Sequence, residues 1–481
     1  MLPTDKLQPR APRVPNTPAL RTAVSFAPPM DERWLYAWGL GSVALGAASL
    51  LVPLYVVALG GDPTALGLLA ASAALLGTPG ALLWGRIADR TRNPRSVVVA
   101  SLLGAAVSLG AIPLLDSVVA VLAVNAVLWF VSAAAAPVLT LLVVADAPER
   151  AWSGRIAALN RYQGFGWAGG LVLGTLWLGV LAPQFDSPLS ARRWLFGVTA
   201  ALAAVSAVAA AKWMPSAATD LGRADRRRIA RFLSGTHRNV KTATFAFTPN
   251  RLYWTTLGLR PRHLARRFTP RLAAYFLAVA LFSTGFAAFW APLPAYLSAE
   301  GYGGDATFGL YLATSLASAA CYGAVGRLSE RFDVRLFQSA ALGVRAAAFP
   351  VVALVGAATG LVATGGAVGV FVVIGVTWAV IAVTGTGLVT RHAPASIRGE
   401  ALGVHAALVA AAGGAGGLLG GWTAEFGYLV AFGVAGGLVV AGAVVVAALR
   451  GLSTPGSSGA ESTERGTTEQ TESTDRVETT D

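Results

Sequence analysis

The sequence contains few charged residues. Asp, Glu, Lys and Arg together make up 13% of its 481 residues, while apolar residues make up 55%. A typical soluble domain carries about a quarter charged residues. The mean hydropathy is correspondingly high, at +0.60. This composition excludes an ordinary soluble fold and predicts a chain that is solvated largely by lipid.

Cysteine and catalytic motifs are also scarce. Cys321 is the only cysteine, so the sequence offers no disulfide framework and no multi-cysteine metal site. It has no zinc-protease signature, no phosphate-binding loop and no carboxylate pair within an apolar run. We therefore expect no metal, no cofactor and no enzymatic activity, and we disfavour an ATP-driven pump. Residues 1–33 are polar and Pro-rich, and lack the apolar core of a signal peptide.

Long apolar runs dominate the rest of the chain, and about 20 apolar residues suffice to cross the hydrocarbon as a helix. A first group of six runs lies at 34–59, 64–84, 96–115, 118–144, 157–181 and 194–213. A second group lies at 272–297, 308–325, 336–355, 361–389, 401–420 and 428–449. The sequence thus predicts an all-α integral membrane protein with twelve transmembrane helices in two six-helix bundles, residues 34–213 and 272–449.

The basic residues indicate the topology. A net charge of +13 would favour nucleic-acid binding in a soluble chain, but here the charges lie in short loops. All but four of the 37 Lys and Arg residues fall on one side of the predicted topology, the exceptions being Arg192, Arg193, Lys212 and Arg345. Since cytoplasmic loops carry the basic excess, we expect a plasma-membrane protein with both termini in the cytoplasm and no nucleic-acid partner.

Three segments lie outside the predicted bundles. Residues 214–271 form a basic middle loop whose stretches 226–233 and 252–254 mix basic and bulky apolar side chains. Such stretches are typical of helices that lie on anionic lipid headgroups, and a solvated linker is the alternative. Residues 1–33 are expected to be a cytoplasmic tail. Residues 450–481 are rich in Ser, Thr and Glu and are expected to be a disordered acidic tail.

The two halves contain matching motifs. Residues 85–90 read Gly-Arg-Ile-Ala-Asp-Arg after the second span, and residues 326–331 read Gly-Arg-Leu-Ser-Glu-Arg after the eighth. Gly154 precedes the fifth span and Gly169 lies within it. In the same way, Gly399 precedes the eleventh span and Gly414 lies within it. These matches indicate a duplicated six-helix unit, as in many transporters. The glycine-dense stretch 413–421 favours close helix packing over a ligand site.

On these residues the sequence resembles the major facilitator superfamily over residues 34–449. The family's loop signature is matched by Gly85, Asp89 and Arg90, and in the second copy by Gly326, Glu330 and Arg331. The resemblance implies two pseudo-symmetric bundles and assigns these loops to conformational switching, with topology anchoring as the alternative. The drug and multidrug exporter branch is suggested by the glycines at 164–170, although that stretch lacks a proline and the fourth span lacks an arginine.

The resemblance also implies that the first, fourth, seventh and tenth spans line a substrate cavity. Their aromatic and polar members are Tyr55, Asn125, Trp129, Trp290 and Trp378. Aromatic rings suit hydrophobic or amphipathic solutes. Packing or membrane-interface positions are the alternative for each of them.

Two ionisable residues lie within the later spans. Arg345 lies in the ninth span, and an arginine at the bilayer centre costs about 2.5–3.5 kcal/mol on insertion scales. It is a candidate for an anion or coupling contact, with snorkelling or an interhelical pair as the alternative. His405, at the start of the eleventh span, is a candidate for coupling because imidazole titrates near neutrality.

We therefore expect a secondary active transporter that exports hydrophobic or amphipathic compounds by alternating access, with a proton or another ion as a candidate coupling partner. An importer of a metabolite such as an organic anion is the alternative within the same class. A transporter-like membrane sensor or scaffold is the alternative from another class.

Overall fold

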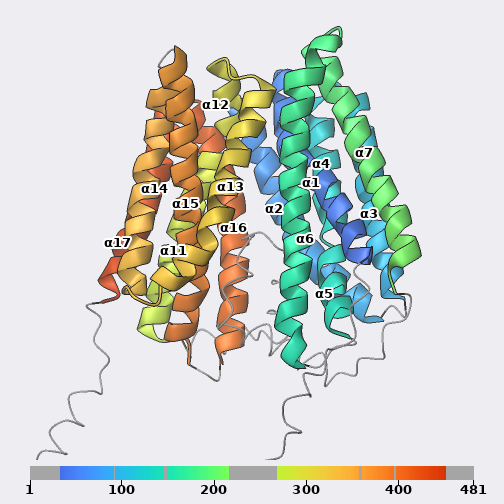
Figure 1. Ribbon diagram of the computed structural model, residues 1–481. Helices are drawn as coiled ribbons and strands as arrows, with labels where there is room; N and C mark the ends of the chain where they lie inside the picture. Colours follow the sequence, from blue (N-terminus) through green and yellow to red (C-terminus); the bar gives the residue numbers. More distant parts are fainter. Residues whose placement is uncertain are drawn as a thin grey trace, which may run out of the picture.

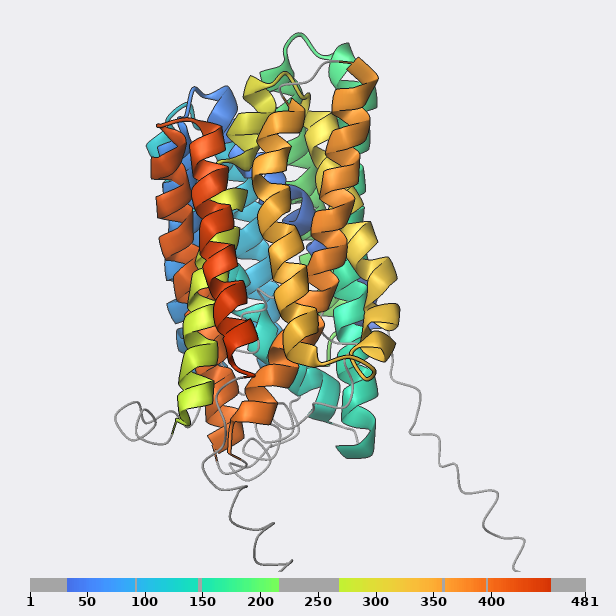
Figure 2. The ribbon, with the colours of Figure 1, turned by 90° about the vertical axis from the view of Figure 1, so that its left-hand side faces the viewer.

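The computed structural model describes residues 33–90, 93–145, 149–215, 268–356, 360–394 and 397–450. Nearly all of them are helical, and the long helices run between the same two ends of the molecule (Figures 1 and 2). Eleven of the spans they form are long and apolar enough to cross a membrane, and one more begins with the apolar helix Pro63–Ala74. The prediction of a twelve-helix membrane protein is confirmed.

Six spans form the N-terminal bundle. Their helices are α1 (Arg33–Ala58), α2 (Pro63–Arg90), α3 (Pro94–Ala111), α4 (Val118–Ser132), α5 (Ala135–Ala145), α6 (Glu149–Leu176) and α7 (Pro188–Trp213). The helices α4 and α5 together make the fourth span. Short helical turns extend α3 through η2 (Ile112–Leu114) and α6 through η3 (Trp177–Leu181) and η4 (Ala182–Gln184).

Six further spans form the C-terminal bundle. Their helices are α11 (Pro270–Trp290), α12 (Leu293–Ala299), α13 (Gly304–Leu328), α14 (Val334–Gly356), α15 (Gly360–His392), α16 (Arg398–Ala424) and α17 (Tyr428–Ala448). The seventh span consists of α11 and α12, which are separated near Pro292. A proline lacks the N–H that would continue the helical ladder, so the break follows from the sequence.

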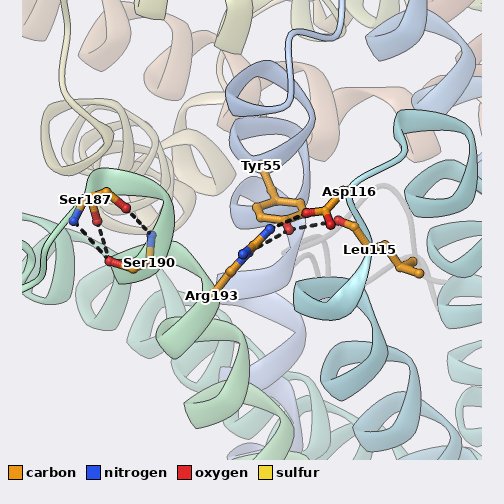
Figure 3. A network of polar contacts seen from close by, with 6 residues as sticks. All are labelled: Tyr55, Leu115, Asp116, Ser187, Ser190 and Arg193. Carbon is orange, nitrogen blue, oxygen red and sulfur yellow. Dashed lines mark hydrogen bonds and ion pairs between the residues drawn. The ribbon is translucent and has the colours of Figure 1, made fainter.

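Helix α7 starts where the local sequence favours a helix start. Pro188 occupies its first turn, where the missing N–H leaves no bond unmade. The backbone N–H of Ser190 donates to the Ser187 hydroxyl at 3.1 Å, and the backbone N–H of Ser187 donates to the Ser190 hydroxyl at 3.2 Å (Figure 3). This capping box satisfies two otherwise unpaired donors and fixes the helix start close to Arg193.

Glycines bring helix backbones into contact in equivalent places of the two bundles. A Cβ at Gly46 in α1 would lie 2.5 Å from the carbonyl oxygen of Trp167 in α6. In the other bundle, Cβ atoms at Gly416 and Gly420 of α16 would overlap the backbone of α11. The first and fifth spans thus pack as the seventh and eleventh do. The expectation that the stretch 413–421 serves helix packing agrees with these contacts.

The two bundles meet at one end of the molecule. We call the end where α1 begins and α17 ends the termini end, and the opposite end, with the loops at 59–62, 115–117, 185–187, 300–303 and 425–427, the far end (Figure 1). At the far end α2 packs on α16, where a Cβ at Gly67 would lie 2.6 Å from the Gly417 carbonyl oxygen. Nearby, the Thr64 hydroxyl donates to the Glu425 carboxylate.

A second contact between the bundles joins α6 to α13. The Phe308 side chain, from α13, is fully buried and belongs to the apolar core of the N-terminal bundle. A Cβ at Gly304 would lie 2.6 Å from Cδ1 of Leu178 in η3. Ala295 of α12 is also part of the N-terminal core. Within the described residues, these close approaches between the bundles lie in the far-end halves of the helices.

Candidate functional site

Aromatic side chains from four helices gather inside the C-terminal bundle. Trp290 of α11 lies 4.9 Å from Tyr311 of α13 and 6.3 Å from Phe371 of α15, between ring centroids. Trp378 of α15 lies 6.1 Å from Phe286 of α11. Both tryptophans are half-buried. The aromatic cluster, as we call it, comprises Phe286, Phe289, Trp290, Tyr311, Phe349, Phe371 and Trp378.

The cluster is continuous between the two predicted tryptophans. Phe289 contacts Trp290 at 5.4 Å and stacks on Phe349 of α14 at 4.0 Å. Phe349 in turn meets Phe286 at 6.3 Å, and Phe286 meets Trp378. The structure therefore brings Trp290 and Trp378 into one group through phenylalanines that the sequence analysis did not single out.

Arg345 is embedded in this cluster. It lies eleven residues after the first residue of α14, about 16 Å along the axis at 1.5 Å per residue, which places it near the middle of the helix. Its side chain is only 2% exposed. The guanidinium carbon lies 4.5 Å from the Phe286 ring centroid and 5.6 Å from those of Phe349 and Trp378. Snorkelling to the membrane surface is therefore not what compensates this charge.

The hydrogen bonds of Arg345 involve one side of the guanidinium. Nη1 donates to the Ile374 carbonyl oxygen at 2.7 Å and to the Thr377 hydroxyl at 3.4 Å, both on α15. Nε is buried and has no hydrogen-bond partner in the described structure. A buried donor without a partner costs about 1–3 kcal/mol, and a desolvated cation–π contact returns about 2 kcal/mol. The rings thus offset part of the cost of burying this charge.

The N-terminal bundle has a smaller pair of rings. Trp129 of α4 lies 6.4 Å from Trp167 of α6, and both are half-buried. Asn125, one turn before Trp129, is 3% exposed. Sequence reasoning missed Trp167, although its position within the glycine run 164–170 was a usable signal, because a large ring among glycines packs against a neighbouring helix.

Tyr55 lies apart from these rings, at the far end. Its hydroxyl donates to the Leu115 carbonyl oxygen at 3.0 Å and accepts from Nε of Arg193 at 3.2 Å (Figure 3). Arg193 also forms an ion pair with Asp116 (Figure 3). The Tyr55 ring is fully buried against Phe196. This network joins α1, α7 and the loop between η2 and α4, and sequence reasoning identified neither Arg193 nor Asp116 as part of it.

The remaining predicted residues lie elsewhere. His405 is half-buried in α16. Gly326 lies in the last turn of α13, and Glu330 and Arg331 occupy the exposed turn that follows. Gly85, Asp89 and Arg90 end α2, but their side-chain surroundings lie outside what the structure describes, as do residues 1–32, 216–267 and 451–481. No group of three potential metal ligands occurs among the described side chains.

Comparison with known proteins identifies the family. The sequence profile of the Major Facilitator Superfamily matches residues 36–417. No curated protein matches the chain. Among solved structures, the nucleoside transporter NupG has a TM-score of 0.63 at 15% identity, covering 87% of this chain and 98% of that one.

Two other solved structures are also similar. A bacterial homologue of the human lysosomal transporter Spinster has a TM-score of 0.61 at 13% identity, covering 87% of this chain and 94% of that one. The human organic anion transporter MFSD10 has a TM-score of 0.52 at 18% identity, covering 87% and 100%. At these identities the likeness shows the fold alone. Together with the profile match over most of its length, it establishes that the chain belongs to the Major Facilitator Superfamily and is a multi-pass membrane transporter of small solutes.

Proposed function

We propose that the protein is a secondary active transporter of hydrophobic or amphipathic solutes. The observation that carries this proposal is the aromatic cluster, in which half-buried Trp290 and Trp378 present large apolar faces with few polar edges. The tryptophan pair Trp129 and Trp167 supplies a similar surface from the other bundle. Carboxylates described by the structure lie only in loops or at helix ends, which disfavours a strongly cationic solute.

The contacts between the bundles support transport by alternating access. The close contacts of α2 with α16 and of α6 with α13 lie at the far end. Because basic loops remain in the cytoplasm, we place the termini end inside the cell, with residues 34–213 and 272–449 as the two moving bodies. The described conformation then corresponds to an inward-facing state. Rocking of the bundles would separate the far-end contacts.

Export across the plasma membrane is the direction we propose. A lipophilic solute that partitions into the inner leaflet reaches an inward-facing site without crossing water. A proton or another ion is the proposed driving partner, with His405 as the coupling candidate. The loops at Asp89 and Glu330 would stabilise one end state, and the basic middle loop would lie on anionic lipid. Import of an organic anion is the second candidate, favoured by the buried charge of Arg345.

Transport in everted membrane vesicles tests the proposal. With an imposed proton gradient, vesicles that contain the protein should accumulate lipophilic dyes that empty vesicles do not. Trp378→Ala should lower the initial rate, whereas Trp194→Ala should leave it unchanged, since Trp194 is 63% exposed on the surface of α7. Failure to move any solute of a broad panel, together with a protein partner that survives detergent extraction, would favour a sensor or scaffold instead.

A further inference from the structure

The buried guanidinium of Arg345, which lies among rings of the aromatic cluster, has one edge without hydrogen bonds to the described residues. Nη1 of Arg345 donates hydrogen bonds to two groups of α15, the Ile374 carbonyl oxygen and the Thr377 hydroxyl. The opposite edge, made by Nε and Nη2, has no hydrogen bond in the described structure, and Nε is buried without a partner. That edge is the one through which a guanidinium binds a carboxylate with two parallel hydrogen bonds.

No counter-charge from the described part of the protein reaches this position. The carboxylates whose side chains the structure describes in and around α13 to α16 are those of Glu300, Asp305, Glu330, Asp333 and Glu425, and all lie at helix ends or in loops. The two ion pairs that the structure describes, Arg193 with Asp116 and Arg450 with Asp333, also lie at the ends of the molecule. Among the described residues, Arg345, near the middle of α14, is compensated only by rings and by polar groups of α15.

The three rings around the Arg345 guanidinium are unequally exposed. Phe349 is fully buried and Phe286 is 8% exposed, whereas Trp378 is half-buried. An anion that approaches Arg345 would therefore pass beside Trp378, and its apolar remainder would lie against the rings of the aromatic cluster.

We propose that Arg345 binds the anionic group of the transported solute, so that the substrate class is amphipathic organic anions, namely aryl or alkyl carboxylates. This inference rests on the proposed transport function and specifies its substrate class. A water molecule at the same edge would satisfy a donor but would supply no charge. A carboxylate supplies two acceptors and the missing negative charge together, while the rings hold the apolar part.

A matched pair of probes tests the inference on the purified full-length protein. Naphthalene-2-carboxylate and naphthalene-2-carboxamide share their ring system and differ in charge. Only the carboxylate should raise the melting temperature strongly, because a ligand of the folded state stabilises it by mass action. In Arg345→Gln its apparent affinity should fall roughly 10- to 150-fold, the range expected for a lost charge-assisted contact, while that of the amide changes little. Lys212→Gln removes one exposed positive charge and should behave as wild type.

Arg345→Lys covers the case in which Arg345→Gln does not fold. Lysine retains the charge but loses the two-pronged edge, so carboxylate binding should weaken in a folded protein. Equal stabilisation by both probes, a carboxylate preference that survives in Arg345→Gln, or no stabilisation by the carboxylate would each overturn the inference. Proteoliposomes separate this failure from failure of the transport proposal. Flux of the amide without flux of the carboxylate would sustain transport of apolar solutes and reject the anion, whereas absence of flux for a broad panel would reject transport.

Discussion

The phenyl ring of Phe308 lies directly against Gly174. This contact between α13 and α6 joins the two bundles at the far end. A Cβ at Gly174 would overlap the ring of Phe308, which is fully buried in the N-terminal core although it belongs to α13. Only a glycine allows this approach. Closure of the far end thus depends both on the lack of a side chain at Gly174 in α6 and on the Phe308 ring of α13.

Gly174→Val should therefore shift the protein away from the far-end-closed state. Overpacking costs about 1–3 kcal/mol, which changes a two-state equilibrium by roughly 5- to 150-fold. The reporter is Ala295→Cys in a Cys321→Ala background, since Ala295 is buried in the same interface. A hydrophilic maleimide should label Cys at this position faster in the Gly174→Val protein.

Gly197→Val is the matched control. Gly197 lies in α7 of the same bundle, and a Cβ there would meet nothing within 4 Å. Labelling should stay at the background rate. Equal labelling rates in the Gly174→Val protein and its parent would mean that the contact between Phe308 and Gly174 does not control far-end closure.

Tyr55→Phe should reduce stability more than transport. The substitution leaves the Leu115 carbonyl oxygen and Nε of Arg193 without the Tyr55 hydroxyl, and a net hydrogen bond contributes about 0.5–1.5 kcal/mol. The melting temperature should fall by a few degrees with little change in the initial transport rate. A double-mutant cycle with Arg193→Gln should show coupling between the two residues. Lost transport at unchanged stability would instead favour the role of Tyr55 in the substrate cavity.

Tyr55 also illustrates where sequence reasoning stops. Mean hydropathy identifies twelve spans because each must match the thickness of the hydrocarbon, and the structure has them. Family resemblance selects the first span as a cavity helix, but it does not say which face of that helix a residue occupies. Tyr55 faces Phe196 and Arg193 of α7. The rotation of a helix that is apolar all round is set by packing, which its sequence pattern does not reveal.

The C-terminal cluster was partly predictable. Arg345 is an unusual residue for a membrane span, so the sequence alone identifies it, and the family resemblance selects the spans that carry Trp290 and Trp378. Their common neighbours, Phe286 and Phe349, are ordinary apolar residues. Nothing in the sequence distinguishes them from other phenylalanines that face lipid or core. The contacts that join these residues come from helices far apart in the chain, and only the packed structure specifies them.

Asp89→Asn should slow transport without weakening solute binding. The loop signature at the end of α2 is expected to stabilise one end state of the transport cycle, so removing its charge should change the rate of interconversion rather than the site. Initial rates in proteoliposomes should fall, while the thermal shift given by a transported solute stays constant. Glu330→Gln should have a similar but separate effect in the second copy. Wild-type turnover in both variants would leave these loops with a role in topology alone.

Arg345→Met should leave the ligand-free protein as stable as wild type or make it more stable. Replacing a buried charge by an apolar side chain of similar length is often neutral or stabilising by about 1–4 kcal/mol, because the desolvation cost disappears. Here the Nε donor has no partner and no carboxylate balances the charge within the described part of the bundle. The melting temperature of the purified protein measures the outcome, with Lys212→Met as the control for a lost surface charge. A large decrease in the Arg345→Met protein would show that the bonds to Ile374 and the contacts with Phe286 hold α14 to its neighbours. Arg345 would then serve the fold, and its charge would need no solute to explain it.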